Sequence, residues 1–169
     1  LRQKISTDFY NLAKAAHTEV AYQDFLLKHP RANEVRNAVH RRDSLAYETA
    51  KQGNSSKDFA AFLSKYKDSE YAEAAASDFD LRLYQEQTVN GTVSELDQFI
   101  DKFPSNPYRG DAEDRIYDLL TEKDVIENYE SFVRKYPSNR NIESTCSSTT
   151  DKSNTKFTCI WICSTMIWF

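Results

Sequence analysis

The sequence contains few residues that make tight turns, and its cysteines are confined to one end. Only three glycines and four prolines occur in the whole chain. This scarcity argues against a β-sandwich or a β-barrel, because both folds need many tight turns. The three cysteines all lie near the C-terminal end, at Cys146, Cys159 and Cys163. The residues before Cys146 contain no cysteine, so we expect them to fold without disulfides, and the odd number argues against a closed disulfide framework in the tail.

Excess basic charge and long apolar segments are also missing. The formal net charge is −4, which does not favour nucleic-acid binding because that function generally uses a basic surface. The most apolar stretch, residues 157–169, has thirteen residues, whereas a helix that crosses a membrane needs ~20. Membrane association through this stretch therefore stays open, and so does the cellular compartment.

The most informative feature of the sequence is a phrase that occurs four times. Its copies are Phe25-Leu-Leu-Lys-His-Pro30, Phe62-Leu-Ser-Lys-Tyr-Lys67, Phe99-Ile-Asp-Lys-Phe-Pro104 and Phe132-Val-Arg-Lys-Tyr-Pro137. The first three phenylalanines recur at a 37-residue spacing, and the fourth follows at a slightly shorter one. The 37-residue spacing also relates three further sets, namely Tyr10, Tyr47 and Tyr84; Thr18, Ser55 and Thr92; and Ala38, Ala75 and Ala112. A fixed period of roughly 20–50 residues is typical of stacked repeats.

Each copy of the phrase predicts the end of an amphipathic helix. Leu96, Phe99 and Ile100 stand at i, i+3 and i+4, a spacing that places them on one helical face. Ser55 and Thr92 precede two of these helices and can cap them in the capping-box pattern. In three copies a proline ends the helix, because proline lacks the amide donor and clashes with the preceding turn.

A second helix is expected to follow each of the first three copies after a short turn. These helices are predicted near residues 33–51, 70–88 and 107–121, with Ser69 and Asn106 as caps of the last two. The recurrent alanines lie on these second helices, where small side chains would allow a close crossing with the first helix.

These patterns predict an all-α fold, a right-handed solenoid of antiparallel helical hairpins with a period of about 37 residues. The array is expected to cover residues 1–137. It comprises a partial repeat at residues 1–16, repeats that start near residues 18, 55 and 92, and a truncated repeat near 122. Residues 138–169 form a polar and then apolar tail. The tail is either a foreign or frame-shifted end of a truncated repeat protein, or an anchor for a membrane or a partner.

The repeated phrase, followed by a tyrosine and an alanine, resembles tetratricopeptide-like repeats. The likeness covers about residues 5–137 and is strongest to bacterial outer-membrane assembly lipoproteins and to periplasmic Tol–Pal-associated repeat proteins. The period is 37 residues rather than about 34, and Lys67 replaces the proline of the second copy. The resemblance implies scaffolding or peptide recognition without catalytic residues, and it favours the bacterial periplasm or cell envelope over the cytoplasm.

No pattern in the sequence indicates catalysis or metal binding. There is no glycine-rich phosphate-binding loop and no nucleophile elbow. Cys159 and Cys163 are four residues apart, but no histidine lies near them to complete a zinc site. His17 and His40 lack neighbouring ligands, and His29 occupies a position that holds Tyr or Phe in the other copies, so we expect a packed ring there. The sequence therefore predicts that the protein is not an enzyme and has no metal ion or cofactor.

Charge is distributed unevenly along the chain. Residues 1–42 hold eight Lys/Arg and four Asp/Glu, whereas residues 68–130 hold five and seventeen, a balance of −12. The acidic segment predicts a surface for a basic protein or peptide. Its candidate residues are Asp97, Asp101, Asp111, Glu113 and Asp114. The alternative is that the last three form an ordinary solvated helix face.

A lysine recurs in every copy and has two interpretations. The four residues are Lys28, Lys65, Lys102 and Lys135. They could form a ladder for acidic ligands, or each could lie in the last turn of its helix, where a cation is favoured by roughly 0.3–1 kcal/mol. For the whole chain, a protein-interaction module or scaffold is the leading hypothesis. A spacer that positions other domains of a longer chain and an accessory domain of an enzyme are the alternatives.

Overall fold

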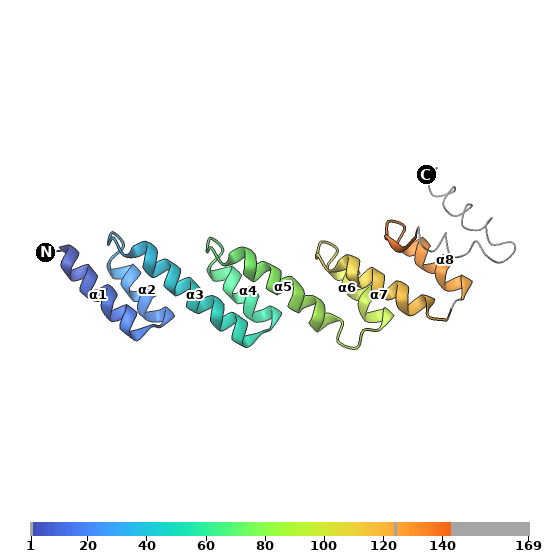
Figure 1. Ribbon diagram of the computed structural model, residues 1–169, viewed down its shortest axis with the longest axis horizontal. Helices are drawn as coiled ribbons and strands as arrows, with labels where there is room; N and C mark the ends of the chain where they lie inside the picture. The colour runs from blue at the N-terminus through green and yellow to red at the C-terminus, as the bar shows by residue number, and fades with distance from the viewer. Residues whose placement is uncertain (1, 124, 143–169) are drawn as a thin grey trace. The chain divides into compact units, whose positions relative to one another are not determined.

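The computed structural model describes residues 2–123 and 125–142, which consist of helices joined by short turns (Figure 1). The helices are α1 (Arg2–Ala16), α2 (Glu19–Lys28), α3 (Val35–Gly53), α4 (Ser56–Lys65), α5 (Ala72–Gln87), α6 (Val93–Lys102), α7 (Arg109–Thr121) and α8 (Ile126–Lys135). No strand occurs among the described residues, so the predicted all-α class is confirmed for them. None of the helices in these ranges has both the length and the apolar character that crossing a membrane requires. The apolar stretch 157–169 and the three cysteines lie outside the described residues.

The chain divides into two compact units, residues 1–86 and residues 87–169. In the first unit, α1 packs against α2, α2 against α3, and α3 against α4. In the second unit, α6 packs against α7 and α7 against α8. Helix α5 joins α4 through a buried cluster that contains Phe59 and Phe62 of α4 and Ala75 of α5.

Hydroxyl side chains begin three of the helices. Thr18, Ser55 and Thr92 are the N-caps of α2, α4 and α6, and each accepts a hydrogen bond of 3.2 Å from the backbone N–H three residues later. The caps predicted for Ser55 and Thr92 are confirmed. At the start of α6, the Glu95 carboxylate also accepts from the backbone N–H of Asn90, two residues before the cap, at 2.9 Å. At the start of α8, Val125 offers no side-chain cap.

The repeated phrase ends each of these helices in the same way. His29, Tyr66, Phe103 and Tyr136 are the C-caps, and their backbone N–H groups donate to the carbonyl of the phenylalanine four residues earlier. Proline follows three of these caps, but Lys67 follows Tyr66 and the turn is unchanged, with Tyr66 N–H bonded to Phe62 at 2.8 Å. Proline therefore accompanies this turn without being required for it.

The predicted caps of the second helices are wrong. Ser69 and Asn106 each accept from the backbone N–H two residues later, at 3.3 Å and 2.9 Å, within the turn that precedes the helix. The N-cap of α7 is Tyr108, which has no side-chain capping bond. Asn139 makes the same contact with Asn141 at 2.8 Å, so the turn after α8 continues to Ile142. The predicted boundary of the array at residue 137 falls inside this turn.

Aromatic side chains make the core of the hairpins. In three places a tyrosine of one helix packs on the aromatic residues at i+12 and i+15. The three sets are Tyr10 with Tyr22 and Phe25, Tyr47 with Phe59 and Phe62, and Tyr117 with Tyr129 and Phe132. The recurrent alanines 38, 75 and 112 are completely buried, which agrees with a close helix crossing at each of them.

Removal of a phrase phenylalanine is expected to be costly. Phe99 is 1% exposed and its ring centroid lies 5.6 Å from that of Phe103. We expect Phe99→Ala to lower the free energy of unfolding by about 3–5 kcal/mol, because the cavity adds to the lost burial. The control is Val89→Ala, because Val89 is 75% exposed. This variant should change the free energy of unfolding by no more than about 0.5 kcal/mol. Chemical denaturation measures both, and a loss below about 1 kcal/mol for Phe99→Ala would contradict the assigned core.

Candidate interaction site

The five predicted acidic residues fall into two groups that differ in their surroundings. Asp101 near the end of α6 and Asp111 at the start of α7 are exposed. Asp97, Glu113 and Asp114 instead make polar contacts inside the second unit. These five carboxylates therefore do not form one free acidic surface.

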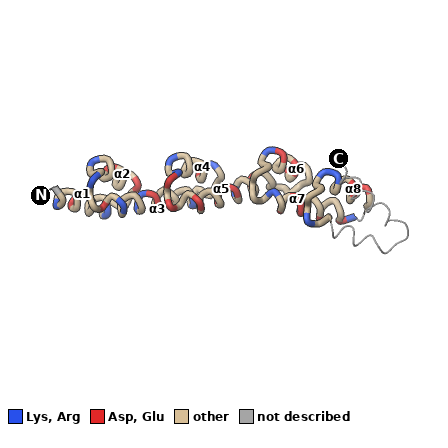
Figure 2. The backbone as a smooth tube through the Cα atoms, turned by 90° about the horizontal axis from the view of Figure 1, so that it is seen from above, with Lys and Arg blue, Asp and Glu red and all other residues tan. Residues whose placement is uncertain are grey.

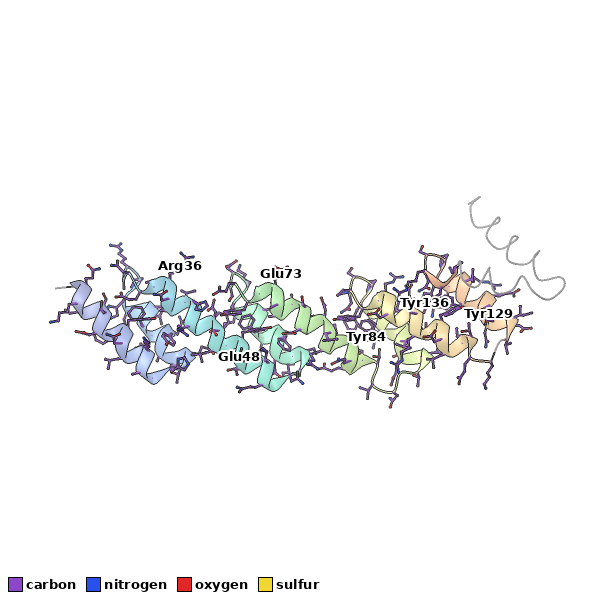
Figure 3. The ribbon with its side chains drawn as sticks, viewed as in Figure 1. Arg36, Glu48, Glu73, Tyr84, Tyr129 and Tyr136 are labelled. Carbon is purple, nitrogen blue, oxygen red and sulfur yellow. The ribbon has the colours of Figure 1, made fainter. Side chains whose placement is uncertain are left out.

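Asp97 on α6 is held by the end of α8. The ammonium of Lys135 lies 2.8 Å from one carboxylate oxygen, and the hydroxyl of Tyr136 donates to the other. Tyr136 is 5% exposed and is labelled in Figure 3. Burial and then the Asp97 carboxylate raise the pKa of Tyr136 well above its ordinary value. The phenol therefore stays protonated and acts as a donor to Asp97 over the whole physiological range.

The first unit contains the same kind of contact between α2 and the end of α4. Glu19 accepts from the ammonium of Lys65 at 2.5 Å and from the hydroxyl of Tyr66. The guanidinium of Arg42 lies 4.9 Å from the centre of the Tyr66 ring. Burial by itself would raise the pKa of Glu19, but the hydrogen bonds from Lys65 and Tyr66 lower it overall. We call each set of carboxylate, lysine and tyrosine a clamp.

The recurrent lysines lie at helix ends, and two of them belong to the clamps. All four lie in the last turn of their helices, as the helix-end interpretation predicted. Lys65 and Lys135 also pair with a carboxylate of another helix, and Lys28 pairs with Asp24 on its own helix at 2.7 Å. A free ladder of cations is therefore a poor description of these residues.

Glu113 and Asp114 on α7 bind the turn that follows α8. The Glu113 side chain is 12% exposed and lies 2.8 Å from Nε of Arg109, and it also accepts from the Asn139 amide at 3.2 Å. Asp114 accepts from the amides of Asn139 and Asn141 at 3.1 Å and 2.8 Å, and it pairs with Arg140. The interpretation of these two residues as a solvated face is wrong, because the turn packs against α7.

Two further acidic residues, Asp118 on α7 and Glu122 at its C-cap, are exposed. Asp118 and Glu122 follow Asp111 by seven and eleven residues, a spacing that returns to one helical face. Arg115 stands between them and is also exposed. The spacing is visible in the sequence, but only the structure separates these carboxylates from Glu113 and Asp114. Figure 2 shows the charged positions along the backbone of each unit.

Two of the histidines, His29 and His40, contact neighbouring side chains. The ring of His29 lies 5.5 Å from that of Phe25 and 4.8 Å from that of Phe9, so the predicted packed ring is confirmed. His40 on α3 contacts the carboxylate of Glu70. No group of three or more His, Cys, Asp or Glu side chains within residues 2–123 and 125–142 could hold a metal ion.

Removing the hydroxyl of Tyr136 tests the clamp. We expect Tyr136→Phe to lower the free energy of unfolding by about 1.5–3 kcal/mol, because the bond to a charged acceptor is lost while the ring stays. Tyr71→Phe is the matched control, because the contacts of Tyr71 with His40 and Tyr47 are made by its ring, which phenylalanine keeps. That variant should change the free energy of unfolding by no more than about 0.5 kcal/mol. Equal losses in urea unfolding would mean that the hydroxyl of Tyr136 contributes nothing specific.

Two shortened chains test the turn after α8. A chain that ends at Ile142 keeps the contacts of Asn139, Arg140 and Asn141 with α7, whereas a chain that ends at Ser138 loses all of them. We expect the shorter chain to be less stable by about 1–3 kcal/mol, because the carboxylate of Glu113 loses its amide partner. Equal unfolding midpoints for the two chains would contradict this role of the turn.

No family model, no curated protein and no solved structure matches this chain. The resemblance to tetratricopeptide-like repeats therefore stays a prediction from the repeated phrase. What the contacts themselves show is a set of helical hairpins in which many charged side chains bind neighbouring helices, with exposed carboxylates left on α6 and α7.

Proposed function

We propose that this chain is a non-enzymatic protein-interaction module or scaffold. Its hairpins would continue one another as a right-handed solenoid of tetratricopeptide-like repeats with a 37-residue period. The observation that carries the proposal is that the buried phenylalanine and alanine positions of the hairpins repeat, whereas exposed positions other than the lysine at the helix end change. A repeat protein separates these two tasks, because the interior sets the stacking and the exterior sets the partner.

Equivalent positions of the copies illustrate this separation. The phenylalanine of the phrase occurs in all four copies and the alanine at the helix crossing occurs in the first three, and all of these residues are buried. Outside the core, the exposed position held by Arg36 becomes Glu73 and then Gly110 at the 37-residue spacing. A surface that changes from basic to acidic to uncharged along otherwise similar hairpins suits recognition better than a single repeated chemical step.

The partner that the charge favours is a basic protein or peptide. Residues 68–130 carry a balance of −12, and a field of this sign attracts cationic ligands. Asp101, Asp111, Asp118 and Glu122 are the exposed carboxylates that would meet such a partner. Asp97, Glu113 and Asp114 would contribute through their charge while they hold the hairpin together.

A structural spacer is the second candidate function. It is favoured by the polar contacts between neighbouring helices, such as Glu19 with Lys65 and Asp114 with Arg140. Charges that bind within the chain leave less surface for a partner. An accessory domain of an enzyme would use the same architecture to position a catalytic domain.

Titration with a basic peptide separates the first two functions. We expect a lysine-rich peptide to bind at low salt and to lose at least about tenfold in affinity when the Debye length falls below ~10 Å. Changing Asp101, Asp111 and Asp118 together to Asn should weaken binding further. The control changes the exposed residues Asp8, Glu48 and Glu73 of the first unit to the matching amides. Glu48 and Glu73 are labelled in Figure 3.

Isothermal titration or fluorescence anisotropy supplies the measurement. Equal binding by both triple variants would show attraction to overall charge and not to α6 and α7. A peptide that fails to bind at low salt would contradict the basic-partner proposal and favour the spacer.

A further inference from the structure

The first hairpin has an open apolar groove between α1 and α2. The groove has a volume of about 290 Å³, and its lining includes Phe9 and Leu12 of α1 and Phe25 and His29 of α2. Phe9 is 44% exposed and Leu12 is 65% exposed, and Ile5 one turn earlier on α1 is 45% exposed. Large apolar side chains at this spacing make an exposed stripe that fits the apolar face of another helix.

The corresponding surfaces of two later hairpins are in contact with a helix. The end of α4 contacts α2 through the clamp on Glu19, and the end of α8 contacts α6 through the clamp on Asp97. In both cases a lysine and the following aromatic residue meet a carboxylate of the preceding phrase-bearing helix. The corresponding residues of the first hairpin are Lys28 and His29, and both line the groove. The groove therefore has the features needed to receive an amphipathic helix with a carboxylate.

Helix α8 of the same chain has these features. Glu130 follows Asp97 at the same spacing at which Phe132 follows Phe99. It therefore occupies the position in α8 that Asp97 occupies in α6. Ile126, one turn earlier on α8, is 51% exposed, and Val125 beside it is 39% exposed. The helix combines a suitably placed carboxylate with apolar side chains that are open to contact.

We propose that α8 of one molecule docks in the α1–α2 groove of a second molecule. Glu130 would accept hydrogen bonds from Lys28 and His29, as Asp97 accepts from Lys135 and Tyr136. Asp24 already holds Lys28 through an exposed ion pair, so the incoming carboxylate shares that ammonium, and His29 supplies the second donor. Ile126 would pack near Phe9 and Leu12. This association goes beyond the interaction-module function, because it needs no other protein.

The distribution of charge along α8 supports the same contact. Its two carboxylates, Glu127 and Glu130, lie in its first half and its cations, Arg134 and Lys135, lie in its last turn, so the first half of the helix is the part that is attracted to Lys28. A contact between two different surfaces of identical molecules does not close on itself unless the geometry forms a ring. The expected product is therefore a head-to-tail series that lengthens with concentration.

The test uses the full chain and two variants with opposite defects. Leu12→Asp places a charge in the groove and leaves α8 intact, whereas Glu130→Lys reverses the acceptor and leaves the groove intact. Sedimentation velocity of the unchanged chain should show an average mass that rises with concentration. Each variant alone should have its self-association weakened by at least about tenfold. Circular dichroism checks that both are folded, and Lys28→Glu replaces Leu12→Asp if the latter unfolds.

Mixing the two variants gives the decisive result. Each pair of variants retains one intact groove and one intact α8, so the mixture should form a one-to-one complex that does not lengthen. An unchanged chain that is monomeric at every concentration would overturn the proposal. So would association that Leu12→Asp abolishes and Glu130→Lys leaves intact, because two grooves would then be facing each other. None of these outcomes depends on binding of basic peptides, which tests the proposed function separately.

Discussion

The packing of one tyrosine against two aromatic side chains of the next helix is the contact on which the hairpins depend. The partners stand at i+12 and i+15 from the tyrosine in all three sets, and the ring centroids of the closest pair lie 5.2 Å apart. Aromatic pairs contribute about 0.5–1.5 kcal/mol beyond the area that they bury. The constant spacing also constrains the connection, because each turn must bring the next helix back to the same ring. The buried alanines complete this constraint, since a larger side chain there would separate the helices.

Burial of the tyrosines that end α4 and α8 creates a second requirement. A buried hydroxyl needs a hydrogen-bond acceptor, and a carboxylate of another helix supplies it in both units. The positions of the two acceptors differ, because Asp97 corresponds to Gln23 at the repeat spacing while the acceptor on α2 is Glu19, one turn earlier. Both units therefore provide a carboxylate acceptor for the buried tyrosine, but the carboxylate stands at a different position of the repeat in each unit.

Features that depend on nearby residues could be predicted from the sequence. The caps at Ser55 and Thr92 and the buried Phe99 follow from spacings of three or four residues, and the structure confirms them. The roles of Glu113 and Asp114 could not be predicted in this way. Their partners are distant in the sequence, in a turn whose residues have the polar composition of many exposed loops. The periodicity shows which helix face is polar, but only the structure shows that another segment covers part of it.

The residues that make polar contacts outside the core differ more between copies than the buried residues do. His40 contacts Glu70 in the first unit, and Asp114 contacts Arg140 in the second unit, so two corresponding positions exchange their acidic and basic residues. In each contact the first residue lies on a helix, α3 or α7, and the second lies in the turn after the following helix. The copy between them has Ser77 and Pro107 at these positions and Phe103 in place of the clamp tyrosine, and these side chains lack the charges and the phenolic hydroxyl.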